Sequence, residues 1–196
     1  MPRGRNPRRR ARGYGMATVR PRRGKRGYVQ RDHYLERWAA WLPAALAWLA
    51  QDPPNYKEAR RHLPMPERPV LSVRRPEEPL RLALLTSSGA YDAQTQAPFN
   101  ETSLLGDSSW RAFPYDLPDE RVAFAHEHYD RTFAREDPEV VLPRRALAAL
   151  GVQTTEHVLS WSGYTFDWPN LLNQTIPQMV AQVRADGANA ALLVPV

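Results

Sequence analysis

The sequence contains no cysteine, and this absence excludes several kinds of chemistry at once. Without a thiol, the 196-residue chain has no disulfide, no zinc–thiolate site and no cysteine nucleophile. It also lacks an apolar run of the roughly 18 residues that a spanning helix needs, so we expect no membrane partner. What is present, 42% hydrophobic and 10% aromatic residues, is typical of a soluble globular domain.

Acidic residues are absent from residues 1–27, which hold eleven of the 27 Lys and Arg residues. The rest of the chain contains the other 16 basic residues and all 21 acidic ones, so its net charge is −5. We expect this tail to lack fixed structure because it has almost no apolar residues. It is either an arginine-rich arm for nucleic acid or an acidic surface, or a solvated extension of a chain that starts downstream, for instance at Met16. Since the tail also lacks the apolar stretch of an export signal, we expect a cytoplasmic protein that contacts nucleic acid only through the tail, if at all.

A helix is predicted for residues 30–51, because apolar residues recur there at the helical spacing of three and four, at Leu35, Trp38, Leu42, Ala45 and Leu49. Pro43 lies inside this pattern and is expected to kink or divide the helix. Residues 52–79 are rich in proline and predict a connector that wraps rather than folds alone. The chain therefore divides into a basic tail (1–27), a helical segment with its connector (28–79) and a domain (80–196).

The domain 80–196 shows short apolar runs alternating with helical patterns. Strands are predicted in 80–89, 121–130, 138–143, 154–164 and 188–196, and helices in 144–151 and 169–187, closed by Gly151 and Gly187. The runs LRLALLTSSG and ANAALLVPV are expected to be buried on both faces. This order predicts a three-layer α/β fold with a mostly parallel sheet, flavodoxin- or Rossmann-like and incomplete at its C-terminus.

In parallel sheets ligands bind beyond the carboxyl ends of the strands, and this rule selects the candidate site. It points to Thr86, Ser87 and Ser88 after the first strand, and to HEHYD after the next. HEHYDR resembles the zinc motif of metallo-β-lactamase-like hydrolases, but Arg131 stands where the last histidine is needed. We therefore interpret His126 and His128 as hydrogen-bonded strand-end histidines and assign no metal ligand. They are expected to share one face, with Asp130 nearby.

Several motifs taken in order resemble one family. The succession TSSG, GDSSWRAFP, HEHYDRTFAREDPEVVLP, SGY and DGANAALLVPV is similar to the selenoprotein B family of glycine, sarcosine, betaine and D-proline reductases, over about residues 80–196. In that family a strand of the ALLVPV kind leads directly into selenocysteine or cysteine. Selenocysteine is encoded by UGA, which is usually read as a stop codon. The resemblance therefore implies that selenocysteine follows Val196 in the intact protein, and that this chain lacks its redox residue.

The resemblance also implies a function and roles for residues. The protein would be a selenocysteine-dependent oxidoreductase that forms a sulfur–sulfur or selenium–sulfur bond while reducing a small-molecule substrate, with possible partner reductase subunits. His126, His128 and Asp130 would transfer or orient protons, Arg111 would bind a substrate carboxylate, and Thr86, Ser87, Ser88 and Asp107 would line the site. No cofactor is expected in this chain. The alternatives are a metal-dependent hydrolase built on HEHYD and a non-catalytic binding protein with a basic arm.

Overall fold

The computed structural model describes residues 31–65 and 79–196. The predictions for the tail (1–27) and for residues 66–78 of the connector lie outside the described residues. Within the described ranges the fold is α/β, built on a mixed and mostly parallel sheet, as predicted.

The main sheet has four strands in the order β3-β5-β1-β6. Their bounds are Trp110–Pro114 for β3, Thr154–Trp161 for β5, Leu82–Thr86 for β1 and Ala190–Val194 for β6. The strands β5, β1 and β6 run parallel, and β3 pairs antiparallel with β5 along one edge. A separate antiparallel ribbon joins β2 (Ala90–Asp92) to β4 (Val122–Phe124). The carboxyl ends of three parallel strands therefore meet at one edge of the sheet.

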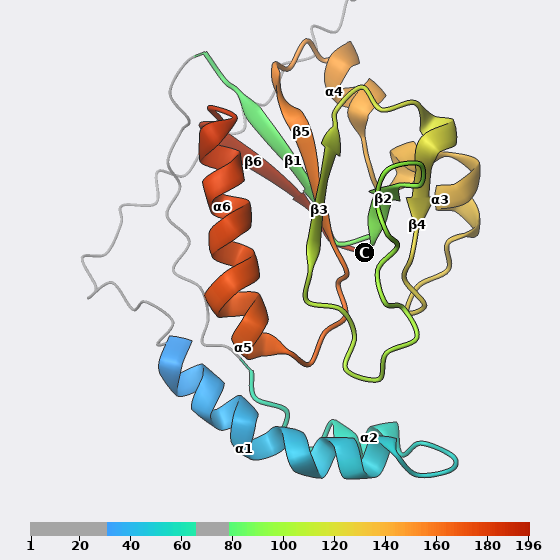
Figure 1. Ribbon diagram of the computed structural model, residues 1–196, viewed down its shortest axis with the longest axis vertical. Coiled ribbons are helices and arrows are strands. Elements are labelled where there is room, and N and C mark those ends of the chain that lie inside the picture. The colour runs from blue at the N-terminus through green and yellow to red at the C-terminus, as the bar shows by residue number, and fades with distance from the viewer. Residues whose placement is uncertain (1–30, 66–78) are drawn as a thin grey trace, which may run out of the picture.

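Helices cover both faces of the sheet and make three layers (Figure 1). On one face lies a continuous helical stretch made of α5 (Trp168–Asn170), a π-helical turn (η3, Leu171–Thr175) and α6 (Ile176–Ala185). The other face carries the β2–β4 ribbon with α3 (Thr132–Glu136) and α4 (Arg144–Ala149), besides the 3₁₀ turns η1 (Asp119–Arg121) and η2 (Pro138–Val140). Both cores follow from strand alternation: Leu85 and Leu159 pack with Met179 of α6, while Leu84 and Val158 pack on the opposite face.

The predicted β1 is confirmed, because its last four residues are buried. The predicted helix ends are also confirmed: Gly151 and Gly187 adopt φ angles of +68° and +72°, which favour glycine. The prediction that ANAALLVPV is a buried strand was wrong, because among the described residues β6 pairs with β1 alone and lies at the edge of the sheet. Its Leu193 is 62% exposed.

Two further predictions are corrected by the structure. Only Val122–Phe124 of the predicted strand 121–130 is extended, and it belongs to the ribbon rather than to the main sheet. Residues 138–140 of the predicted strand 138–143 form a 3₁₀ turn, because Pro138 begins it and the Asp137 carboxylate accepts the Glu139 N–H at 3.0 Å. The helix α1 (Arg31–Leu49) passes through Pro43 undivided. The segment Trp110–Pro114, for which no element was predicted, is strand β3.

The helical segment packs against the domain through aromatic rings. Helix α1 contacts the short α2 (Tyr56–Ala59), which begins where the Asn55 side chain accepts the Glu58 N–H. The Trp38 ring lies 5.2 Å from the Trp168 ring and 5.9 Å from the Phe166 ring, both after β5. Figure 1 shows α1 and α2 on the side toward which β5 runs. This packing places the helical segment next to the strand ends that define the candidate site.

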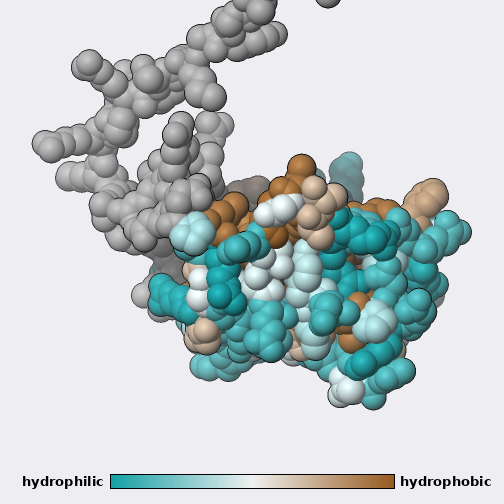
Figure 2. Space-filling model, turned by 90° about the horizontal axis from the view of Figure 1, so that it is seen from above, coloured by the Kyte–Doolittle hydropathy of each residue, from teal (hydrophilic) through white to brown (hydrophobic). Residues whose placement is uncertain are grey.

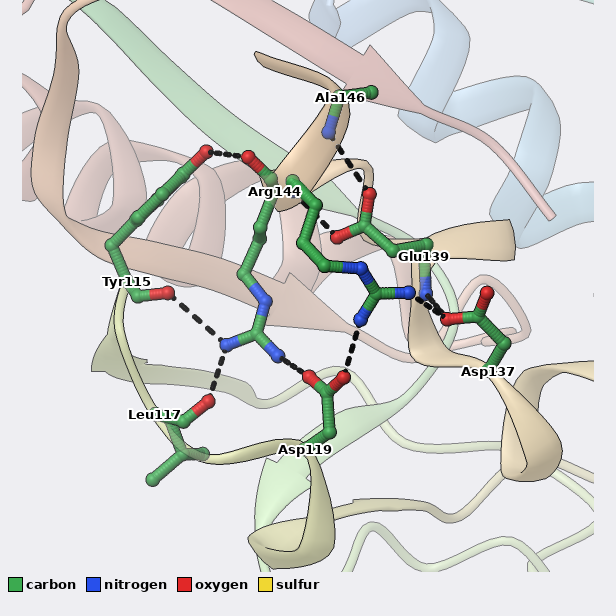
Figure 3. A network of polar contacts seen from close by, with 8 residues as sticks. Tyr115, Leu117, Asp119, Asp137, Glu139, Arg144 and Ala146 are labelled. Atoms are coloured by element: carbon green, nitrogen blue, oxygen red, sulfur yellow. Dashed lines mark hydrogen bonds and ion pairs between the residues drawn. The ribbon is translucent and has the colours of Figure 1, made fainter. Parts of the chain in front are cut away.

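A buried arginine fastens α4 to the segment after β3 (Figure 3). Arg144 is 7% exposed and donates to the carbonyl oxygens of Leu117 at 2.6 Å and Tyr115 at 3.1 Å, and it forms an ion pair with Asp119. The exposed Arg145 bridges Asp119 and Asp137. The buried charge is thus compensated by acceptors on every side, as burial of an arginine requires.

The surface is mainly polar in the view of Figure 2, where hydrophobic residues gather along one border. In the two described ranges no helix has the length and apolar character of a membrane span. Isolated large apolar side chains on the surface, such as Leu150 and Phe133, are ordinary in globular proteins.

Candidate functional site

Ser87 is the point at which three chain segments meet at the carboxyl ends of the strands. Its N–H donates to the Val194 carbonyl oxygen at 3.1 Å, and its own carbonyl oxygen accepts the Gly163 N–H at 3.0 Å. Its hydroxyl accepts the Val196 N–H at 2.9 Å. The segment after β1 is therefore hydrogen-bonded to the segments that follow both β5 and β6.

Gly89 brings the ribbon against this meeting point. Its φ of +67° turns the chain from β1 into β2, and a Cβ there would lie only 2.4 Å from the Ala125 carbonyl oxygen. The Ala125 N–H donates to the Gly89 carbonyl oxygen at 3.0 Å. Because of this close approach, His126 lies beside the TSSG turn; only glycine combines this φ with this contact.

His126 is buried, with 4% of its surface exposed, and its Nδ1 accepts the His128 N–H at 3.1 Å. An accepting Nδ1 places the ring hydrogen on Nε2. Burial lowers the pKa of His126, and the neighbouring His128 and Arg131 lower it further. The imidazole is therefore neutral at pH 7 and presents one buried N–H donor.

Three buried side-chain atoms lack a hydrogen-bond partner within residues 31–65 and 79–196: Ser88 Oγ, Ser160 Oγ and His126 Nε2. All three belong to the carboxyl-end side of the sheet. Ser88 follows β1, Ser160 lies opposite Thr86 in the β1–β5 register, and His126 follows the ribbon strand that pairs with β2. Native proteins seldom leave buried polar atoms unpaired. Their gathering here makes this edge the candidate functional site.

Tyr129 completes the site and was not singled out from the sequence. Its hydroxyl donates to the Ser88 carbonyl oxygen at 3.0 Å, and its ring lies 5.0 Å from the His126 ring. Burial raises the pKa of Tyr129 to about 12. The phenol is therefore a neutral donor that holds His126 against the TSSG turn. Its position inside HEHYD was the available signal, whereas nothing in the sequence marked Ser160.

The rings of His126 and His128 are close, with centroids 5.8 Å apart, but His128 and Asp130 are exposed whereas His126 is buried. The expectation that the two histidines share one strand face was wrong, because residues 126–130 form a turn rather than an extended strand. His128 is exposed, and its ring centroid lies 3.7 Å from that of Tyr164. The exposed Asp130 accepts the Thr132 N–H at 2.9 Å at the start of α3, and this backbone hydrogen bond lowers its pKa. Among the residues placed by the structure, no group of three or more His, Asp or Glu side chains is arranged to hold a metal ion.

Arg111 of β3 and Asp107 hold the loop that precedes β3 in place. The Arg111 guanidinium donates to the Ala97 and Pro98 carbonyl oxygens and to the Ser109 hydroxyl, and it lies 4.3 Å from the centroid of the Phe99 ring. Asp107 accepts the N–H groups of Asn100 and Ser109, at 2.8 and 2.7 Å. Burial raises the pKa of Asp107, but the hydrogen bonds from Ser109 and Asn100 and the charge of Arg111 together outweigh it, so the pKa is lowered and Asp107 is ionised at pH 7.

Of the predicted site residues, the structure thus brings Thr86, Ser87, Ser88 and His126 together. His128 and Asp130 are exposed, and the side chains of Arg111 and Asp107 are bonded to the loop that precedes β3. Comparison of the chain with family models, with curated proteins and with solved structures finds no match. The function is therefore argued from the site alone.

Proposed function

We propose that this chain is part of a selenocysteine-dependent oxidoreductase related to component B of the glycine, betaine, sarcosine and D-proline reductases, and that selenocysteine follows Val196. The observation that carries the proposal is the hydrogen bond from the Val196 N–H to the Ser87 hydroxyl. It ties the end of β6 to the edge where Ser88 and His126 present unpaired buried polar atoms. A residue after Val196 would therefore begin at the candidate site.

The chemistry of this edge suits a selenolate. The reaction class oxidises a selenol and a thiol to a selenium–sulfur bond, or two thiols to a sulfur–sulfur bond, and the two electrons reduce the substrate. An anionic nucleophile or leaving group is stabilised by preorganised donors in a site that excludes water. The neutral His126 supplies an N–H without a charge of its own, and Ser88 adds a hydroxyl that has no partner among the described residues. His126 would then orient or transfer a proton.

Arg111 has a defined place in this proposal. Its guanidinium uses four of its five N–H groups on three carbonyl oxygens and one hydroxyl, so a substrate carboxylate that accepts two hydrogen bonds has to replace at least one of these acceptors. Carboxylate acceptors form stronger hydrogen bonds with arginine than neutral oxygens do, which makes the exchange favourable.

In the part of the chain that the structure describes, the edge of β6 opposite β1 pairs with no strand. The chain crosses from β5 over β1 to β6 with α6 on one face, and right-handed crossovers would place the next helix on the same face. On that face an apolar groove of about 600 Å³ lies between α6 and β6, lined among others by Leu85, Ile176, Val180 and Leu193. A helix after β6 would pack into this groove and bury the exposed Leu193.

Selenium analysis of the expressed protein tests the proposal. The gene is expressed with its natural downstream nucleotides in a bacterium that inserts selenocysteine, and the product is measured by intact mass and elemental analysis. We expect one selenium atom per chain and a mass above the 22.4 kDa of this chain. A selenium-free product of that mass would contradict the proposal. The same gene in a host without selenocysteine insertion is the control.

A further inference from the structure

A second concave site lies between the helical segment and the domain. This aromatic cleft has a volume of about 520 Å³ and is walled by α1, α2 and the segment after β5. Its rings include Trp38, Trp41, Tyr56, Tyr164, Phe166 and Trp168. Its volume falls in the range of small-molecule sites, roughly 300–1,000 Å³.

Two walls of the aromatic cleft, Trp38 and Trp41, offer ring faces rather than hydrogen-bond donors. The Trp38 indole N–H donates to the Phe166 carbonyl oxygen at 3.0 Å, and that of Trp41 donates to the Arg61 carbonyl oxygen at 3.1 Å. The Trp38 and Trp41 rings also pack against one another, with centroids 4.8 Å apart. Because both indole donors are used, these walls are rigid and suit a flat apolar body.

Charge decides which kind of ligand fits. Aromatic faces attract quaternary ammonium groups, yet no Asp or Glu is among the residues that line the cleft. Its charged or titratable nitrogen groups are Arg60 and His128. The Arg60 guanidinium has no hydrogen bond or ion pair with any described residue. A cation would meet this uncompensated positive charge, whereas an anion would pair with it.

We propose that the aromatic cleft binds a small molecule with a flat apolar body and an anionic group such as a carboxylate, held by Arg60. The cleft adjoins the candidate site, because Gly163 lines it and contacts Ser87, and because the His128 N–H donates to His126. A ligand in the cleft therefore lies next to Ser87. The inference goes beyond the proposed redox function and does not rest on it, because every residue it uses lies within this chain.

The test compares two probes that share one aromatic body, 2-naphthylacetate and (2-naphthylmethyl)trimethylammonium, by calorimetric titration of the full 196-residue chain. We expect the acetate to bind and the ammonium not to bind. Arg60→Gln removes a charge-assisted pair and should weaken acetate binding roughly tenfold or more. Arg61→Gln is the matched control. Arg61 pairs with Glu58 at 3.2 Å and does not line the cleft, so the variant should bind the acetate as tightly as the unchanged chain does.

Three results would overturn the proposal: no binding of the acetate, binding of the ammonium equal to or tighter than that of the acetate, or equal losses in the two arginine variants. Both arginines are exposed, so circular dichroism should show both variants folded. Failure of these titrations and absence of selenium from the expressed protein are separate outcomes, because the titrations use no residue beyond Val196.

Discussion

Substitution of Gly89 by alanine tests how the candidate site is held together. An alanine Cβ would stand 2.4 Å from the Ala125 carbonyl oxygen and 3.2 Å from the His126 Cβ, at a backbone φ of +67°. The positive φ costs about 1–2 kcal/mol for a residue with a Cβ. Overpacking against backbone adds about 1–3 kcal/mol, and the hydrogen bond from Ala125 to Gly89 contributes about 1 kcal/mol. We therefore expect Gly89→Ala to lower the free energy of unfolding by about 3 to 6 kcal/mol.

Gly151 provides a control with nearly the same backbone. Its φ is +68°, but an added Cβ would meet nothing within 4 Å. Gly151→Ala should cost only about 1–2 kcal/mol from the positive φ. Urea unfolding gives the free energy of unfolding of each variant, and the comparison is valid if the two m-values are equal. The difference between the two free energies then measures the effect of the close approach of the ribbon to Gly89. If Gly89→Ala and Gly151→Ala destabilise the protein equally, Ala125 and His126 are not held against Gly89 in the way described.

Three further changes have expected outcomes. Arg144→Met leaves the Leu117 and Tyr115 carbonyl oxygens without their donor and should lower the free energy of unfolding in urea by about 2–4 kcal/mol. Arg145→Met, on the exposed side of the same network, should lower it far less. Equal losses in the two variants would contradict the burial argument. Because the pKa of His126 is lowered below its ordinary value of 6.5, unfolding takes up a proton there, so stability should fall as the pH drops below 6.5. His126→Gln should flatten this slope, whereas His128→Gln should not, and an unchanged slope in His126→Gln would refute the assignment. Hydrogen bonding to Arg121 lowers the pKa of Asp92 to about 2, so the stability that the ionised Asp92 contributes should be lost as the pH falls from about 4 toward 2. Asp92→Asn should not show this loss of stability in acid. An equal loss in that variant would contradict the role given to Asp92.

The parts of the fold that local patterns determine were predictable. The apolar run of β1 and the glycines that end α4 and α6 follow from chain chemistry within a few residues. Strand β3 was not predictable in this way, because its extended form comes from pairing with β5, some fifty positions on along the chain. Residues 138–143 have strand-forming valines, but Asp137 and Pro138 favour a turn.

The candidate site was partly predictable for the same reason. The rule of strand ends selects Ser87, Ser88 and His126 without knowledge of contacts. Their assembly depends on the Gly89 contact with Ala125 and on the Tyr129 hydroxyl, which join segments about forty residues apart in the chain. His126 is buried whereas His128 is exposed. The spacing rule for an extended strand could not predict this difference, because the segment turns.

The nucleotide sequence after the Val196 codon tests the central claim most directly. The account predicts UGA in frame, followed by an open frame and by a selenocysteine-insertion hairpin just downstream. The translation beyond it should give a short loop with a cysteine as the resolving thiol and then an amphipathic helix that suits the groove beside α6. A UAA or UAG codon at that position, or a UGA followed at once by further stop codons, would contradict the account.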